Sequence, residues 1–430
     1  MPQTYGRWAS TKWSMLYPPD KVLKSLQLLP LCYQPSGIID FMFQGNILST
    51  GDYNVGLMNE YNNSYYTSPQ YYAAKEANNK IHKYGTILNN CTWFGADSIM
   101  TFSPSFDLSC VLLDSLYVPL ITNSPLYQGY VQAGFYKNAN SEPHIMLVNR
   151  RAIQTQANLM SISPVSYPPL VTYNNSYTSA EPQTVRLFPS DETGAVIGTD
   201  IAFYDPFDST LYKALPDYAD VEIGPGDGRL LQMVGTLRSN PVQNSVIYAS
   251  GYLQGSITVS GNVTFTEDSD VTMLPNTSIT INSGGSLTVN GDLHISADCH
   301  ITVNQGGTLT LNTLNTFFPN TAGIDVHYGE ININNSNLTF FGDTGILGEA
   351  STIRLSNSEF RFDYLGRITN YSSGTYGDSG SIIASNCSFT ANPGLESWFG
   401  FSVMHSSCFV LITALSARPG QVFILRTPTF

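Results

Sequence analysis

Four short segments of the chain recur at an interval of 22 residues, and this repeat restricts the possible folds more than any other feature of the sequence. Residues 286–289, 308–311, 330–333 and 352–355 each alternate polar and apolar side chains in the same phase. A fixed period of about 20 to 30 residues, with one short strand at the same place in each unit, is typical of a solenoid, in which every repeat stacks on its neighbours.

The segments between these quartets complete the predicted coil. Further strand-like quartets begin six or eight residues apart, among them residues 278–281 and 300–303. The bends carry Gly284-Gly285 and, 22 residues later, Gly306-Gly307. Glycine tolerates the positive φ that sharp bends require. Three short strands and three bends per coil predict a parallel β-helix.

The alternation also predicts the core, because successive residues of a strand point to opposite faces. The apolar members of the quartets are expected to point inward and stack: Leu287, Val289, Leu309, Leu311, Ile331, Ile333, Ile353 and Leu355. Polar members are expected to point outward: Thr288, Thr310, Asn332 and Arg354. Asn335, Asn357 and, after a longer insertion, Asn386 predict a ladder of stacked amides at one bend, although turn chemistry alone also favours Asn there.

The repeat resembles the right-handed parallel β-helix family, the pectate-lyase-like fold that also occurs in polysaccharide lyases, phage tailspikes and bacterial surface proteins. The resemblance covers residues 250–390 and rests on periodicity, which specifies architecture well and function poorly. It implies the architecture of the C-terminal half and leaves the activity open.

The resemblance also implies what a catalytic β-helix would need: acidic residues that hold a calcium ion, and a basic residue that abstracts a proton on the same face. The acidic candidates are Asp268, Asp270, Asp292 and Asp298. Asp at bends and strand starts is also ordinary turn chemistry, and Arg354, Arg361 and Arg367 come later and are expected to face solvent. Calcium is therefore the one candidate cofactor, and a catalytic β-helix is the less favoured interpretation.

Length and composition limit the class of protein. A chain of 430 residues exceeds what one core organises, so two or three domains are expected. Only 12% of residues are charged, and the net charge is -13. This profile suits an extracellular β-rich protein and argues against nucleic acid as a partner. The sequence contains no stretch of 18 apolar residues, so we expect no membrane-spanning helix. The first residues lack the features of a signal peptide, so an export signal is expected outside this chain.

The cysteines and histidines predict no metal site. The six cysteines lack the CxxC spacing of zinc sites, and His294 and His300 show neither HxxxH nor HxH spacing. Most cysteines are expected to be buried thiols, with a Cys91–Cys110 disulfide as the less favoured alternative.

Residues 1–109 are predicted to form a partial α/β segment. Apolar spacing predicts a helix over residues 19–29, an apolar run at 38–43 predicts a buried strand of a parallel sheet, and Ser68-Pro69 opens a second helix. A long loop separates the strand from the second helix. This order is that of a closing unit of an α/β barrel, whose strands and helices alternate.

From residue 110 to 237 the pattern changes to short strands separated by Pro, Asn and Gly, which predicts an antiparallel β-sandwich. Within it, Gly224-Pro225-Gly226-Asp227-Gly228 lies between two apolar strands. We expect this segment to be a hairpin turn, because it lacks the Lys-Ser/Thr ending of a phosphate loop.

The barrel-ending helix, residues 130–135, residues 144–151 and the Gly-Pro-Gly-Asp-Gly turn together resemble the end of a glycoside hydrolase barrel with its C-terminal β-sandwich. The resemblance covers residues 1–237 and departs from the family at the strands that would carry the catalytic carboxyl pair, which are not in this sequence. The sequence patterns and the two resemblances together predict four segments: a partial α/β barrel-like segment (1–109), a β-sandwich (110–237), a parallel β-helix (245–395) and an irregular C-terminal end (396–430).

Glycosidases need two carboxyl groups about 5 to 10 Å apart. Asp40 lies in the buried strand, and Asp52 and Glu60 lie on the loop at its C-terminal end, so these are the catalytic candidates. Turn chemistry and solvation explain all three residues as well. Aromatic residues that could stack on sugar rings, or equally pack the loop onto the rim, lie nearby: Tyr61, Tyr65, Tyr66 and Trp93.

The sequence therefore predicts the C-terminal part of an extracellular or cell-surface, bacterial, carbohydrate-directed protein. Its expected partner is a polysaccharide or cell-surface glycan, and the β-helix would serve as spacer or contact surface without catalysis of its own. The alternatives are a structural or adhesive surface protein and, less favoured, a β-helix polysaccharide lyase or hydrolase.

Overall fold

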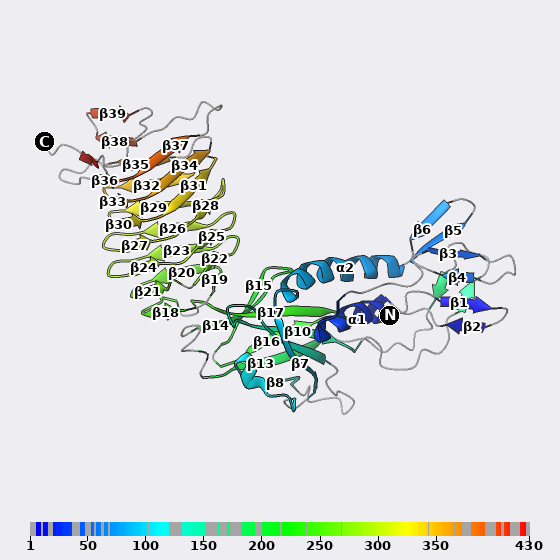
Figure 1. Cartoon of the computed structure of the whole chain (residues 1–430). Helices are drawn as coiled ribbons and strands as arrows, with labels where there is room; N and C mark the ends of the chain where they lie inside the picture. Colours follow the sequence, from blue (N-terminus) through cyan, green and yellow to red (C-terminus); the bar gives the residue numbers. More distant parts are fainter. Residues whose placement is uncertain are drawn as a thin grey trace. The chain divides into compact units, whose positions relative to one another are not determined.

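The computed structural model of this chain is mainly β, with a β-solenoid in its C-terminal half (Figure 1). The chain divides into two compact units: the first comprises residues 1–190 and 203–233, and the second comprises residues 191–202 and 234–430. The structure describes residues 6–9, 12–15, 20–36, 44–47, 53–55, 57–61, 64–67, 69–100, 104–119, 131–151, 161–163, 170–172, 182–191, 193, 200–215, 217–237, 240–248, 250–267, 269–342, 344–363, 367–371, 380–391, 401–405, 408–412 and 422–426.

Two α-helices of the first unit confirm the sequence prediction. They are α1 (Asp20–Leu28) and α2 (Pro69–Leu88). The same unit contains two 3-10 helices, η1 (Leu29–Tyr33), which directly follows α1, and η2 (Leu108–Val111), which follows β7. The apolar stripe of α2 is buried at Ala77 and Tyr84. The predicted buried strand at residues 38–43 lies outside the described residues.

An antiparallel sheet supports these helices. It contains β7 (Thr92–Ile99), β9 (Val131–Lys137), β10 (Pro143–Asn149) and β17 (Gly228–Gly235), with β14 (Ile201–Asp205) and β15 (Thr210–Lys213) beside β17. Every residue of β10 is buried, so this strand is covered on both faces. One face packs on the helices through the cluster Leu28, Leu31, Cys32, Ala77, Tyr84, Leu88, Cys91, Tyr136, Met146, Val148 and Leu230.

A second antiparallel sheet of the first unit contains β8 (Leu113–Tyr117), β13 (Gln183–Pro189) and β16 (Ala219–Ile223). The turn at residues 224–228 joins this sheet to the first one, because β16 pairs with β13 whereas β17 pairs with β10. The predicted hairpin is therefore wrong: the tight turn exists, with Gly226 at φ 70°, but its flanking strands belong to different sheets. A sheet-to-sheet corner needs the same Gly and Pro residues as a hairpin, so composition could not separate the two.

The buried His144 of β10 gives the first unit a pH-dependent stability. Its ring Nδ1 donates to the backbone carbonyl of Glu142 (3.0 Å), and burial lowers the pKa of the imidazole. The unfolded chain therefore binds a proton near pH 6.5 that the folded chain does not bind until a lower pH. Stability is expected to fall as the pH drops through that unfolded value.

Urea unfolding at about pH 7 and about pH 5 tests this expectation. The variant His144→Gln should lose part of the acid-induced decrease in the free energy of unfolding, whereas His82→Gln, at an exposed position of α2, should keep it. An equal pH dependence in all three proteins would contradict the argument.

The remaining strands of the first unit form small sheets that are described mainly by their backbone. One sheet contains β1 (Gly6–Ala9), β2 (Lys12–Met15), β3 (Gln44–Ile47), β4 (Tyr53–Val55), β5 (Met58–Tyr61) and β6 (Ser64–Thr67). The other contains β11 (Ser161–Ser163) and β12 (Leu170–Thr172).

The second unit is the predicted solenoid, drawn from green to orange in Figure 1. Its strands stack into three sheets. The β24 sheet contains β18 (Ser245–Ile247), β21 (Asn262–Phe265), β24 (Ser286–Val289), β27 (Thr308–Leu311), β30 (Glu330–Asn334), β33 (Thr352–Ser356), β36 (Ser381–Ser385) and β40 (Val422–Arg426). The β26 sheet contains β20 (Ser256–Val259), β23 (Ser278–Ile281), β26 (His300–Val303), β29 (Gly323–His327), β32 (Gly345–Glu349), β35 (Arg367–Tyr371), β38 (Phe401–His405) and β39 (Cys408–Ile412). The β28 sheet contains β19 (Gly251–Leu253), β22 (Val271–Met273), β25 (Leu293–Ile295), β28 (Thr316–Phe318), β31 (Asn337–Phe341), β34 (Glu359–Asp363) and β37 (Ser388–Ala391).

Parallel pairing holds the stack in the predicted register. Leu287 pairs with Leu309, which pairs with Ile331, and all eight residues predicted to point inward are buried. Only at the end do strands run the other way: β39 pairs antiparallel with β38, and β40 pairs antiparallel with β36. These strands lie in the segment 396–430 that the sequence predicts to be irregular.

Amide ladders join successive turns at the bends. Asn312 Nδ2 donates to Asn290 Oδ1 (2.7 Å), and Asn334 Nδ2 donates to Asn312 Oδ1 (3.2 Å). At the predicted bend, Asn386 Nδ2 donates to Asn357 Oδ1 (3.1 Å), and Asn357 has a positive φ of 49°. At Asn357 and Asn386, which both have a positive φ, Asn is favoured because it tolerates this backbone conformation. At both bends its amide also bonds to the adjacent turn.

The described cysteines are free thiols: Cys32, Cys91, Cys110, Cys299 and Cys387. The alternative of a Cys91–Cys110 disulfide is therefore wrong, and burial raises the pKa of the Cys91 thiol to about 11. Among the described helices, none combines the length and the apolar character that a bilayer crossing requires.

Candidate functional site

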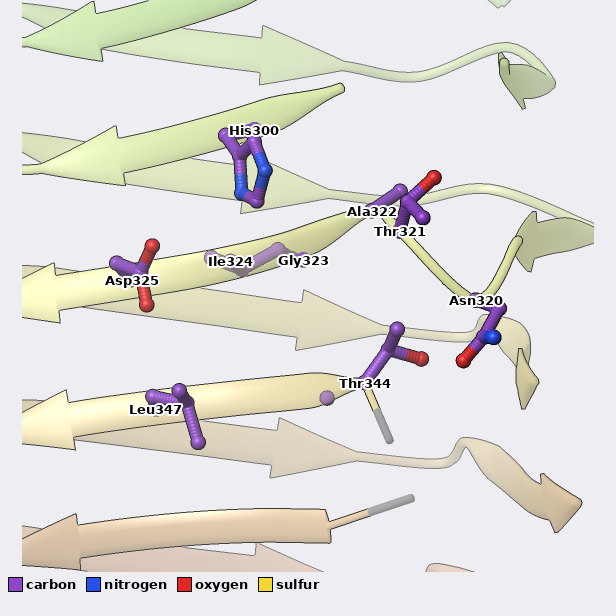
Figure 2. A pocket seen from close by; sticks show the side chains of 10 residues that line it. His300, Asn320, Thr321, Ala322, Gly323, Ile324, Asp325, Thr344 and Leu347 are labelled. Atoms are coloured by element: carbon purple, nitrogen blue, oxygen red, sulfur yellow. The ribbon is translucent and has the colours of Figure 1, made fainter. Parts of the chain in front are cut away.

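A groove on the outer face of the β26 sheet is the best candidate site that the described residues form (Figure 2). It crosses three successive turns, β26, β29 and β32, and has a volume of about 170 Å³. Its lining residues are His300, Asn320, Thr321, Ala322, Gly323, Ile324, Asp325, Thr344, Gly345 and Leu347.

Two glycines create this groove. His300 pairs with Gly323, and the next turn places Gly345 beside Gly323. These residues occupy the same outward-facing position on successive strands, so the column of side chains at this position is interrupted for two turns. In the preceding turns the same column carries Ser256 and Ser278. The missing side chains leave a hollow with the His300 imidazole at its edge, as Figure 2 shows.

The two glycines differ in what surrounds them. A Cβ at Gly345 would lie 1.7 Å from the backbone oxygen of Arg367, so only glycine fits there. A Cβ at Gly323 would lie 3.5 Å from the backbone oxygen of Gly345, which is an ordinary contact. Gly323 can therefore be replaced to fill the groove without straining the solenoid.

The neighbouring column supplies a carboxylate and an apolar wall. Asp325 pairs laterally with Leu347, and both side chains are partly exposed on the outer face. At the bends, Thr321 Oγ1 accepts the backbone N–H of Asp298 (2.8 Å), and Thr344 Oγ1 donates to the backbone oxygen of Phe341 (2.9 Å). These two hydroxyls are thereby fixed, and they line a groove that offers an imidazole, a carboxylate, hydroxyl groups and one apolar side chain.

Beside the groove, the same face carries a histidine–glutamate pair. His327 Nδ1 lies 3.0 Å from Glu349 Oε2, and both side chains are partly exposed. None of the ten groove residues is Lys or Arg. Over a longer stretch, residues 239–353 contain nine acidic residues and no Lys or Arg. The electrostatic potential of this part of the solenoid therefore disfavours polyanionic ligands.

The catalytic candidates of the N-terminal segment cannot be placed. Asp40 and Asp52 lie outside the described residues, and the structure describes only the backbone of Glu60, in β5. The side chains of Tyr61, Tyr65 and Tyr66 lie outside the described part in the same way. A carboxyl pair and an aromatic wall at this loop remain predictions.

Trp93, the fourth aromatic candidate, is described. Its indole Nε1 donates to the backbone oxygen of Cys32 (3.0 Å), and its ring is 39% exposed. A bulge at this point of β7 shifts the pairing with β9 and leaves the neighbouring Phe94 exposed as well. The hydrogen bond fixes the indole, and the exposed part of the ring stays available for a ligand.

The acidic candidates for calcium do not form one cluster. Asp270 and Asp292 precede β22 and β25 and are one turn apart, whereas Asp298 lies at the bend before β26, with φ 57°. Asp268 lies outside the described residues. In the described part of the chain, no three His, Cys, Asp or Glu side chains are placed to share a metal ion.

Known proteins give no further guidance, because no family model, no curated protein and no solved structure matches this chain. The groove must therefore be interpreted from its own chemistry. The sequence analysis missed it because Gly323 and Gly345 look like bend residues. The signal was the change at the outward positions, from Ser-Ile-Thr and His-Ile-Thr to Gly-Ile-Asp and Gly-Ile-Leu-Gly.

Proposed function

We propose that this chain belongs to an extracellular, bacterial, carbohydrate-directed protein, and that its solenoid binds an uncharged glycan without cleaving it. The observation that carries the proposal is the groove across β26, β29 and β32, with hydrogen-bonding groups on its edges and Leu347 as an apolar wall. Sugar rings present hydroxyl groups around their rim and C–H groups on their faces, so they match a groove of this mixed character.

Non-catalytic binding fits the groove better than lyase chemistry. A lyase acting on an acidic polysaccharide needs basic side chains or a cation near the substrate carboxylates, and neither Lys nor Arg lines the groove. The assignment of the solenoid to the right-handed, pectate-lyase-like family, and of the first unit to the end of a glycoside hydrolase-like barrel with a β-sandwich, belongs to the same proposal.

A structural or adhesive role is the second candidate. It is favoured by the amide ladder Asn290–Asn312–Asn334 and by the parallel stacking from β18 to β36, which make this part of the solenoid a continuous rod-like element. Such a stalk would need neither the groove nor the side chains of His300 and Asp325, so glycan binding separates the two roles.

Affinity electrophoresis in gels that contain one soluble polysaccharide each tests the proposal. We expect hydroxyethyl cellulose, galactomannan or another uncharged polymer to retard the native chain, and polygalacturonate to leave its migration unchanged. Gly323→Thr, which fills the groove, should weaken the binding by about tenfold, or about 1.4 kcal/mol. Reducing-sugar assays should show no release of product.

Thr280→Ser is the matched control, because Thr280 lies on the same sheet two turns before Gly323. This variant should bind as the native chain does. Retardation by polygalacturonate alone, or equal binding of the native chain and Gly323→Thr, would reject the groove as the site. Absence of retardation by every uncharged polymer would favour the structural role.

A further inference from the structure

Two exposed phenylalanines lie on a different face of the solenoid from the groove. Phe317 of β28 is 54% exposed and Phe341 of β31 is 38% exposed. Their ring centroids are 6.4 Å apart and their planes differ by 25°. We call this pair the aromatic platform. The two rings form one small contiguous apolar patch on a sheet face whose neighbouring outward positions carry His294, Thr339 and Arg361.

The sheet makes the platform rigid. Phe317 pairs with Thr339 on the next turn, and Phe341 pairs with Asp363, so the two rings project from adjacent strands in fixed register. The inward neighbours Phe318 and Phe340 are fully buried and stacked at 4.6 Å. The platform therefore stands on a packed core and presents two nearly parallel rings with little conformational freedom to lose on binding.

The charges around the platform are mainly negative. Asp363 lies beside Phe341, and the guanidinium of Arg361 is paired with Glu359 (Nε to Oε1, 3.0 Å). Toward the start of the same sheet, Asp270 and Asp292 precede β22 and β25. An anionic polymer would be repelled from this face, whereas an uncharged ligand would not.

The platform is too small for a stable interface with a second copy of the chain. Two phenylalanine rings exposed to this degree offer on the order of 200 Å² of apolar surface. A stable protein interface needs about 800 Å² from each partner. The net charge of -13 also opposes self-association. A sugar ring needs only one aromatic face, because its C–H groups carry partial positive charge toward the negative π surface.

We propose that the aromatic platform is a second glycan subsite, in which Phe317 and Phe341 stack on successive rings of an uncharged polysaccharide. This inference rests on the proposed function and adds a site that the groove does not include. Two subsites on one rigid solenoid would raise the apparent affinity for long polymers far above that for short oligosaccharides, because the second contact becomes intramolecular.

The test uses the full chain and the same uncharged polymers, with Phe317→Ser, Phe341→Ser and the double variant. Each single variant should weaken binding by about twofold to tenfold, and the double variant by more. Leu314→Ser, which removes a 69% exposed apolar side chain outside the stacked pair, is the matched control and should bind as the native chain does. Circular dichroism spectra confirm that every variant is folded.

The outcomes separate this inference from the proposed function. If the Phe317 and Phe341 variants bind normally while Gly323→Thr loses affinity, the platform is rejected and the groove stands. If the platform variants lose affinity while Gly323→Thr binds normally, the platform stands and the groove is rejected. Loss of affinity in Leu314→Ser, or a native dimer that becomes monomeric in the double platform variant, overturns the platform as a glycan subsite. A native chain that binds no uncharged polymer overturns both.

Discussion

Replacing Phe340 by alanine is expected to destabilise the solenoid by about 3 to 5 kcal/mol, because the change removes the centre of a buried aromatic column. The Phe340 ring stacks on Phe318 (centroids 4.6 Å apart) on one side and on Phe362 (5.5 Å) on the other. All three side chains are buried. The truncation leaves a cavity whose walls are held by the parallel pairing of β28, β31 and β34, so the surroundings can relax only partly.

Hydrogen exchange and urea unfolding measure this effect. Amides of β28, β31 and β34 should lose protection in Phe340→Ala before those of β20 and β23, since each turn of a solenoid depends mainly on its neighbours. The matched control is Phe317→Ala on β28, whose 54% exposed ring should contribute within about 0.5 kcal/mol. A cost below about 1 kcal/mol for Phe340→Ala would show that the stacked column is not a packed core.

The repeat made the solenoid core predictable from sequence. Alternation within a quartet decides which side chains point inward, and this local rule correctly predicted that Leu287, Ile331 and Ile353 are buried. The amide ladder was predicted only in part: Asn386 bonds to Asn357 as expected, whereas the ladder Asn290–Asn312–Asn334 lies at a bend for which none was predicted. Periodicity thus carries over into three-dimensional contacts wherever every turn has the same length.

The candidate groove was not predictable, because it depends on a turn of different length. The bend at residues 312–315 makes its coil one residue longer, so His300 pairs with Gly323 at an offset of 23, whereas Thr308 pairs with Glu330 at an offset of 22. A fixed 22-residue ladder aligns Gly323 with Gly345, but it aligns His300 with Ala322 and so does not place the imidazole beside the two glycines. The structure is needed to place His300 beside Gly323 and thus at the edge of the groove.

In the first unit, sequence predicted elements better than connections. Short strands and both helices followed from local patterns, but the turn at residues 224–228 joins two sheets, and nothing local distinguishes that corner from a hairpin. Which strands pair is decided by contacts between distant residues, for example His144 with Gln232. A single sequence with no internal repeat in this unit does not carry that information.

Replacing Arg229 by methionine is expected to destabilise the first unit by about 3 to 5 kcal/mol, because it leaves a buried carboxylate without its cation. Arg229 Nη1 contacts Asp205 Oδ2 (2.8 Å) and Asp208 Oδ2 (2.7 Å). The Asp205 side chain is only 1% exposed. Tyr84 donates its hydroxyl to Asp205 Oδ1 (2.9 Å), but a hydroxyl does not neutralise a charge.

An exposed pair provides the matched control for this variant. Arg186 holds Asp220 with two hydrogen bonds of 2.8 Å, and its guanidinium lies over the Tyr218 ring. Because water screens this pair, Arg186→Met should cost no more than about 1 kcal/mol. A similar cost for Arg186→Met and Arg229→Met would mean that burial does not set the value of the Arg229 contact.

The pH dependence of Arg229→Met identifies the buried charge as the cause. Desolvation already raises the pKa of Asp205 in the native protein, and loss of the guanidinium should raise it further. A carboxyl whose folded pKa exceeds its unfolded pKa stabilises the fold at low pH and loses that contribution as the pH rises through the folded value. The stability deficit of Arg229→Met should therefore shrink as the pH falls, and Arg229→Met with Asp205→Asn should recover part of it at neutral pH. A deficit that is constant with pH and is not reduced by Asp205→Asn would assign the effect to lost packing of the Arg229 side chain instead of to an unpaired carboxylate.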